Sequence, residues 1–262
     1  MKQHLLKVLS NVQVSARYWH MTLDTSRVQE TIKPGQFFHV RCSDEYTPFL
    51  RRPFSIYLIN KEERTIEFLY LVKGEGTAAL TKKESGDTVD LFGPAGKGFQ
   101  IPEHAKEILL LARGVGIATL AALAQEASFQ GVHCTAVLSA RSKDDLLAAD
   151  MLKAFGTKVY PVTEEEQTSD VESVERLMHQ KMKEKKIDAI YTCGSKRLSK
   201  LAQRFADHYN LPGEIALEEH MGCAMGACFA CVCDIEEDDG SHKSVRVCID
   251  GPVFPLKKVV LS

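Results

Sequence analysis

Residues 220–233, HMGCAMGACFACVC, carry four of the eight cysteines of the chain, separated mainly by small residues. Cys223, Cys228 and Cys231 have the spacing C-x4-C-x2-C, and Cys248 follows farther along the chain. This is the ligand spacing of plant-type [2Fe–2S] proteins. Zinc sites usually pair their ligands on two knuckles, whereas one C-x2-C pair occurs here. The spacing therefore favours a [2Fe–2S] cluster with these four ligands, and the alternatives are zinc, a disulfide knot and a small cysteine-containing core.

The residues between the cysteines suit a chain that wraps a cluster. Gly222, Ala224, Gly226 and Ala227 are small, so backbone N–H groups can approach the sulfur atoms closely. Gly226 can also adopt a positive φ without penalty. The fourth cysteine of the stretch, Cys233, is interpreted as a spare buried residue rather than a ligand.

The composition describes an ordinary globular protein. The chain has 262 residues, of which 44% are hydrophobic and 26% charged, and its net charge is −2. This length is enough for two domains with sizeable cores. No stretch approaches the ~20 apolar residues of a membrane span. No basic surface indicates nucleic acid, so neither nucleic acid nor a membrane is expected as a partner. We expect a cytoplasmic location, where clustered thiols are more often ligands than disulfides. Cys42, Cys134 and Cys193 lie in strand-like runs and are expected to act as small apolar residues.

Residues 1–100 have the pattern of an antiparallel β-barrel. Short segments rich in Val, Ile, Phe and Tyr are bounded by Gly, Pro, Asn and Asp, and one short helix is expected at 76–84. The expected strands are 5–14, 18–25, 35–42, 53–60, 65–72 and 87–93.

Residues 101–219 alternate short apolar runs with segments of helical period, which predicts a doubly wound parallel sheet. The expected strands are 107–112, 133–140, 158–163, 188–194 and 214–219, and the expected helices are 117–127, 173–185 and 197–209. Residues 220–262 then form a third part, the cluster subdomain. The fold class is therefore a β-barrel followed by an α/β domain and a C-terminal [2Fe–2S] subdomain.

Two segments of the barrel indicate a flavin. In LRRPFSI, the residues Arg52 and Phe54 share one face of an extended strand, so a cation for a pyrophosphate and an aromatic surface point the same way. In LVKGEGTAAL, the residues Gly74, Gly76 and Thr77 lie where a strand turns into a helix, which can supply free N–H groups to a phosphate. The alternatives are a solvated arginine on an edge strand and an ordinary helix cap by Thr77.

These segments, in this order, resemble the ferredoxin reductase family of flavoproteins, whose barrel binds FAD through an Arg-x-[Tyr/Phe]-Ser strand and a glycine-rich turn. FGPAGKGF resembles the loop that joins the flavin and nicotinamide domains of that family. With the C-terminal cysteines, the whole chain resembles the electron-transfer subunits of class B dihydroorotate dehydrogenase. The resemblance implies FAD, a [2Fe–2S] cluster and NAD as cofactors. It also implies an FMN-containing catalytic dehydrogenase subunit as partner, in a hetero-oligomer of the heterotetramer type.

The resemblance also implies which residues bind the cofactors. The electron path would run between a nicotinamide cofactor and the partner flavin, through FAD and the cluster. The implied FAD contacts are Arg52, Pro53, Phe54, Ser55, Leu71, Val72, Lys73, Gly74, Gly76 and Thr77, and the implied nicotinamide contacts are Gly114, Gly116, Cys193 and Gly194.

The nicotinamide turn departs from the family pattern. The family has a glycine-rich turn followed by proline, whereas this chain has Ala112 and Arg113 in place of two glycines and Thr119 in place of the proline. Because the glycines let a dinucleotide approach the backbone, we expect steric interference to outweigh any attraction of Arg113 for phosphate. Two alternatives follow: an FAD and [2Fe–2S] subunit for another dehydrogenase with weak or absent NAD(H) binding, and a zinc-stabilised adaptor without enzymatic activity. Glu218 and Glu219 lie at a strand end next to the cysteine stretch, where they face either flavin or water, and a solvated pair is expected.

Overall fold

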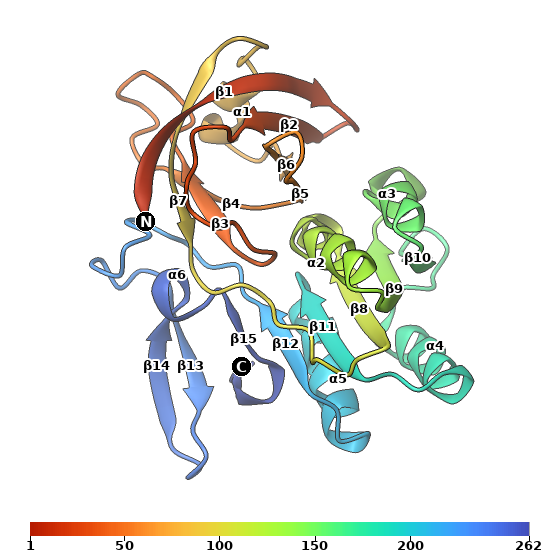
Figure 1. The fold of residues 1–262 in the computed structure, drawn as a ribbon. Helices are drawn as coiled ribbons and strands as arrows, with labels where there is room; N and C mark the ends of the chain where they lie inside the picture. The colour runs from red at the N-terminus through yellow and green to blue at the C-terminus, as the bar shows by residue number, and fades with distance from the viewer. Residues whose placement is uncertain (262) are drawn as a thin grey trace.

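The computed structural model describes residues 1–261, and its N-terminal part is a single curled sheet of seven strands (Figure 1). All pairings in this sheet are antiparallel, in the order β4-β3-β7-β1-β2-β6-β5. The strands are β1 (Lys2–Gln13), β2 (Tyr18–Asp24), β3 (Phe37–Val40), β4 (Arg52–Ser55), β5 (Leu58–Asn60), β6 (Thr65–Leu71) and β7 (Thr88–Ala95).

The long strand β1 makes the sheet curl. Its first half pairs with β7 and its second half with β2, with an irregularity in register between Val8 and Ser10. The edge strand β4 then comes back over β6, because Phe54 stacks on Tyr70 with ring centroids 5.2 Å apart. The predicted antiparallel barrel is therefore confirmed, with its apolar core inside the curl.

The single strand predicted at 53–60 is wrong, because β4 and β5 lie at opposite edges of the sheet. Between them, Ile56 and Tyr57 are buried while the backbone changes partners. The N–H of Ile56 donates to Gln36 O, next to β3, and the N–H of Tyr57 donates to Glu67 O, on β6. A continuous apolar run gives no sign of such a change. The helix expected at 76–84 is also shorter, because α1 spans Glu75–Leu80.

The second sheet has the order β10-β9-β8-β11-β12-β15. Strands run outward in both directions from β8, with helices on both faces, so the doubly wound α/β architecture is confirmed (Figure 1). Helix α2 packs on one face and α4 and α5 on the other, which explains why residues 108–111 are fully buried. The strands are β8 (Glu107–Arg113), β9 (His133–Ala140), β10 (Lys158–Thr163), β11 (Ala189–Cys193), β12 (Gly213–Ala216) and β15 (Val253–Pro255).

The helices of this part agree with the periodicity of the sequence. Asp170 accepts a hydrogen bond from the N–H of Ser173 at the start of α4, and Ser195 accepts one from Leu198 at the start of α5. The N–H of Ile59 donates to the side chain of Gln125 on α2, which joins the barrel to the second sheet. The helices are α2 (Ile117–Phe129), α3 (Ala149–Ala154), α4 (Val171–Glu184) and α5 (Lys196–His208), with 3-10 turns η1 (Gly114–Gly116) and η2 (Lys143–Asp145); α3 was not expected from the sequence.

The C-terminal part leaves the second sheet and returns to it. It contains the hairpin β13 (Val232–Glu236) and β14 (His242–Arg246), the short helix α6 (Val247–Asp250), then β15 and the turn η3 (Leu256–Lys258). Because β15 pairs antiparallel with β12, the sheet is mixed rather than purely parallel, and residues 253–255 belong to it. The division into residues 1–100, 101–219 and 220–262 stays a prediction, although residues 253–255 of the third part pair with the sheet of the second. None of the helices in residues 1–261 is long and apolar enough to cross a membrane.

Candidate functional site

A cavity of about 500 Å³ lies between the barrel, the start of α2 and the segment that follows β12. Most of the predicted flavin contacts line it, together with residues that come from the second domain. The lining comprises Phe37, Arg52, Pro53, Phe54, Ser55, Leu69, Tyr70, Leu71, Lys73, Gly74, Glu75, Gly76, Thr77, Val115, Ala118, Leu217, Glu218, Glu219, His220, Met221 and Pro252.

Arg52, the first residue of β4, and Arg51, which directly precedes it, have different surroundings. Arg52 lines the cavity, where its Nη1 donates to Leu50 O at 2.7 Å. Arg51 points the other way, where its guanidinium donates to the Asp90 carboxylate at 2.6 Å and to the Asp90 carbonyl at 2.8 Å. Successive side chains of a strand alternate between faces. Arg52 is therefore the arginine that can reach a ligand in the cavity.

The glycine turn before α1 combines a helix cap with open space. The Thr77 hydroxyl accepts hydrogen bonds from the N–H groups of Lys73 and Gly74, at 2.9 and 3.2 Å, so the expected cap is present. A Cβ on Gly74 would meet nothing within 4 Å, and one on Gly76 would come no closer than 3.5 Å to Arg52 Nε. The packing of the chain itself therefore requires neither glycine. Both leave room for a group in the cavity.

Two of the predicted flavin residues differ from the others in their surroundings. Val72 does not line the cavity; its N–H donates to Arg17 O and its side chain packs against the barrel core. Phe54 lines the cavity but is 8% exposed, since it stacks on Tyr70. Its ring therefore supports the cavity wall and offers little surface to a ligand.

The acidic residues that follow β12 also belong to the site. Glu218 and Glu219 are both exposed, as expected of a solvated pair, and both line the cavity. Glu218 is exposed toward the cavity, and desolvation by the protein around it raises the pKa of its carboxyl. Its Oε1 lies 4.0 Å from Cys193 Sγ, and the fully enclosed Cys193 thiol has its pKa raised by burial and then by Glu218. Their place at the carboxyl end of a strand was the available signal.

The four predicted nicotinamide residues lie outside this cavity, where two strand-to-helix turns cross. A Cβ on Gly116 would lie 2.7 Å from Cys193 O, and one on Gly194 would lie 2.5 Å from Arg113 O. Both glycines are therefore required by the contact between the turns after β8 and β11. Gly114, with φ of +55°, has only Tyr18 Oη near it, at 3.8 Å.

Arg113 extends over the carboxyl ends of three strands. From the end of β8 its Nη1 donates to Ser139 Oγ on β9 at 2.6 Å, and its Nη2 forms an ion pair with Glu164, which follows β10. Its side chain is 19% exposed. Open α/β sheets bind ligands at this edge, so here a guanidinium already paired within the protein occupies it.

The cysteine loop brings its thiols together as two pairs. Cys223 Sγ accepts hydrogen bonds from the N–H groups of Met225 and Cys228, at 3.5 and 3.4 Å. Burial acts to raise the pKa of the Cys223 thiol, but these donors outweigh it and lower that pKa to about 7. Cys231 and Cys248 are buried together, and the N–H of Cys248 donates to Cys231 Sγ at 3.4 Å.

The backbone of the loop has the conformation that small residues allow. Ala224, Gly226 and Phe229 have positive φ values of 54°, 80° and 54°. A Cβ on Gly226 would lie 2.0 Å from Ile249 Cδ1, so α6 requires glycine there. Within residues 1–261, no three His, Cys, Asp or Glu side chains converge as a single metal site. Two pairs match a binuclear cluster with two thiolates per iron better than zinc, which needs four ligands on one ion.

Cys233 takes no part in the hydrogen bonds to sulfur that join the other cysteines of the loop. It is half-buried on β13 against the core of the second sheet. Burial, followed by the charges of Glu219 and Asp234, raises the pKa of its thiol to about 11. Its place outside the C-x4-C-x2-C spacing supports the interpretation of Cys233 as a spare residue.

Known proteins resemble this chain over its whole length. A family model described as the iron–sulfur cluster binding domain of dihydroorotate dehydrogenase B matches residues 218–260. The electron transfer subunits of dihydroorotate dehydrogenase B (NAD(+)) from Geobacillus kaustophilus and Desulforamulus reducens are 36% and 34% identical to it. The alignments cover 98% of both chains for the first and 97% of both chains for the second.

Solved structures share the fold. The NADH-dependent reduced ferredoxin-NADP oxidoreductase has a chain with a TM-score of 0.82 and 26% identity, covering 98% of this chain and 90% of that one. A ferredoxin NADP+ reductase from Neisseria gonorrhoeae, with bound FAD and NADP, has a TM-score of 0.63 and 19% identity, covering 80% and 92%. At that identity the likeness concerns the fold alone.

Proposed function

Since this chain belongs to the family of electron transfer subunits of dihydroorotate dehydrogenase B, we propose that it binds FAD in the cavity and a [2Fe–2S] cluster on the cysteine loop. It transfers electrons between a nicotinamide cofactor and an FMN-containing catalytic subunit, in a heterotetramer. We assign it to the cytoplasm, because its eight cysteines are free thiols and thiolate ligands persist in a reducing compartment.

The observation that carries this proposal is the continuity between the cavity and the cysteine loop. His220 and Met221 line the cavity, and Cys223 follows in the same stretch of backbone. A flavin in the cavity and a cluster on the loop would therefore be separated by little protein. Bound there, FAD supplies the exchange between two-electron and one-electron carriers.

The residues of the chain hold and enclose these groups. Arg52 offers a guanidinium for the pyrophosphate, and Gly74 and Gly76 leave its phosphates room beside the first turn of α1. The N–H groups of a first helical turn have no partners within the helix, so they are free to donate. Glu218 holds its proton more tightly than usual at the far wall, beside the buried Cys193.

One observation favours a second arrangement, in which nicotinamide binds weakly and another donor or the partner supplies electrons. Arg113, paired with Glu164 and Ser139, covers the strand ends where a dinucleotide would lie. A nucleotide has to displace this ion pair or bind around it. We therefore propose that NADH reduces the flavin slowly, although the relatives carry NAD(+) in their names.

Protein purified without oxygen tests the proposal. We expect about one FAD and about two iron atoms per chain, with flavin and iron–sulfur absorption bands, and a stable complex with an FMN-containing dihydroorotate dehydrogenase catalytic subunit. A colourless protein with stoichiometric zinc would instead support the adaptor. A coloured protein that ignores that catalytic subunit would point to another dehydrogenase.

A further inference from the structure

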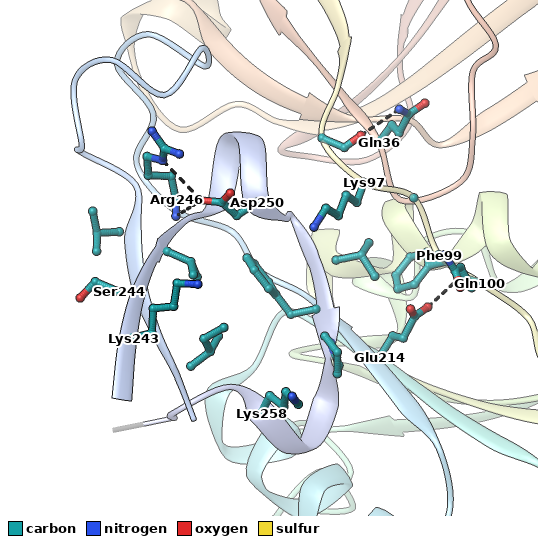
Figure 2. Close-up of a pocket in the computed structure, with 18 of the residues that line it drawn as sticks. Gln36, Lys97, Phe99, Gln100, Glu214, Lys243, Ser244, Arg246, Asp250 and Lys258 are labelled. Atoms are coloured by element: carbon teal, nitrogen blue, oxygen red, sulfur yellow. Dashed lines mark hydrogen bonds and ion pairs between the residues drawn. The ribbon is translucent and has the colours of Figure 1, made fainter. Parts of the chain in front are cut away.

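A second and larger groove, of about 1040 Å³, lies on the C-terminal part of the molecule (Figure 2). It is bounded by the hairpin β13–β14, by β15 and by the segment 96–100 that leaves the barrel. It shares no lining residue with the flavin cavity. Its volume reaches the upper limit of small-molecule pockets, which are about 300–1,000 Å³, so its size suits a segment of chain.

The hairpin leaves apolar residues uncovered along this groove. An isolated two-stranded hairpin is marginally stable in water. The hairpin is tied to the body by the Ile235–Val259 bridge and by the N–H of Val260, which donates to Asp234 O at 2.9 Å. Ile235 is only half-buried, and Val232 is 38% exposed. Their groove-facing surface is therefore available to another chain.

The groove is also rich in cations. Lys97 projects into it in Figure 2, and within residues 1–261 neither Lys97 nor Lys33 forms an ion pair. Lys243 has only a loose pair with Glu237, at 3.5 Å. Two acids of the wall already have partners: Glu214 accepts the N–H of Gln100 at 2.8 Å, and Asp250 pairs with Arg246 at 3.3 Å. The charge of Asp250 acts on Lys97 without forming an ion pair with it, so the carboxylates of an occupant would still find Lys33 and Lys97 without an ion-pair partner.

The groove is continuous with the cysteine loop. Arg246 lines it and donates to Gly226 O at 3.2 Å, and its guanidinium lies 5.3 Å from the centre of the Phe229 ring. Phe229, 63% exposed, also lines the groove and lies between two of the cluster ligands. A chain in the groove would therefore lie beside the cluster, as an electron-transfer partner has to.

From these observations we infer that the groove seats an extended, acidic segment of the catalytic subunit. Its apolar side chains pack on Val232 and Ile235, and its carboxylates face Lys33 and Lys97. The inference rests on the proposed function, because that function supplies the partner. It adds where the partner is anchored and by what chemistry it is recognised.

Charge reversal in the complete, cofactor-loaded subunit tests this. The double variant Lys33→Glu/Lys97→Glu should bind the catalytic subunit roughly tenfold or more weakly than the unmodified protein, with a smaller loss of affinity between about 50 and about 300 mM salt. The matched control, Lys153→Glu/Lys186→Glu, reverses two exposed lysines on the second domain and should bind like the unmodified protein. Flavin and iron content should stay the same in both.

Hydrogen exchange of the unmodified complex gives a readout without mutation. Amides of residues 96–100 and 242–246 should exchange more slowly when the catalytic subunit is bound. Unchanged exchange at these amides, or equal affinity of both double variants for the catalytic subunit, would overturn the inference that the groove binds this subunit. Either result leaves the proposed function intact. Failure of the cofactor-loaded, unmodified subunit to bind the catalytic subunit overturns both.

Discussion

Arg51 and Arg52 are chemically identical neighbours whose roles follow from the face of the strand on which each lies. The flanking pattern of the sequence placed Arg52 with Phe54, and the structure puts Arg52 in the cavity and Arg51 on Asp90. That much could be predicted, because alternation along a strand is local. The contact of the half-buried Arg51 with Asp90 could not be predicted, since the two residues meet only through the pairing of distant strands.

Arg52→Ala should weaken FAD retention by roughly tenfold or more, because charge-assisted hydrogen bonds to phosphate contribute about 1.5–3 kcal/mol. Arg51→Ala should keep the flavin but lower the free energy of unfolding by about 1–3 kcal/mol, because it leaves the Asp90 carboxylate partly buried without its partner. Flavin content after gel filtration and urea unfolding of both variants measure this. The reverse result would exchange the two roles.

Arg113→Gly should speed the reduction of the flavin by NADH, because it removes both the side chain over the strand ends and its pair with Glu164. We expect an apparent Kd for NADH lower by roughly tenfold, equivalent to about 1.4 kcal/mol. Anaerobic stopped-flow at the flavin band measures it, and Arg113→Lys serves as the control that keeps the charge. Fast, saturable bleaching of the unmodified protein by micromolar NADH would refute the interference.

Glu218 should make stability depend on pH. Burial raises the pKa of its carboxyl above the ordinary value of 4.5, so the folded state favours the protonated form. Its contribution is therefore complete below that ordinary value and is lost as pH rises through the folded-state pKa. The free energy of unfolding of Glu218→Gln, measured relative to that of the unmodified protein, should therefore be higher at about pH 8 than at about pH 5. Urea midpoints that differ by the same amount at both pH values would contradict this.

Among the elements, the helices were the most predictable. Segments 117–127, 173–185 and 197–209 correspond to α2, α4 and α5, because helical period and capping residues are written locally in the sequence. Two features depend on strand partners far away in the chain: the break between β4 and β5, and the antiparallel pairing of β15. The periodicity of the sequence does not indicate such distant pairings. The contact that requires Gly116 and Gly194 could not be predicted either, since the crossing of the turns after β8 and β11 brings distant residues together.

Two glycines on these elements should respond oppositely to alanine. Gly116→Ala should lower the free energy of unfolding by about 1–3 kcal/mol, because its Cβ would lie 2.7 Å from the rigid Cys193 carbonyl. Gly76→Ala should leave that free energy unchanged or raise it by about 0.5–1 kcal/mol, as alanine does in a helix, while reducing flavin retention. Thermal unfolding and flavin content measure the pair. Equal destabilisation by both substitutions would remove the argument for ligand space at Gly76.

At the scale of the whole molecule, flavin and cluster should be separable. Each of the four variants Cys223→Ala, Cys228→Ala, Cys231→Ala and Cys248→Ala should lose iron and keep FAD, because the barrel has its own core. Cys233→Ala should keep both groups, as Cys233 lies outside the C-x4-C-x2-C spacing of the predicted ligands. Iron and flavin analysis of the five proteins decides this, and iron loss in Cys233→Ala with retention in another variant would change the ligand set.

The pairing of β12 with β15 has a consequence for how such a molecule can be assembled. Ala216 lies opposite Val253 in one antiparallel ladder, so everything between them leaves and re-enters the sheet at the same place. Neighbouring chain ends of this kind are where domains accept inserted modules, since the host needs only a short turn to close without them. Residues 217–252 thus have the topology of an inserted module, so we expect the α/β sheet to accept a different module between Ala216 and Val253 without a change in its strand order.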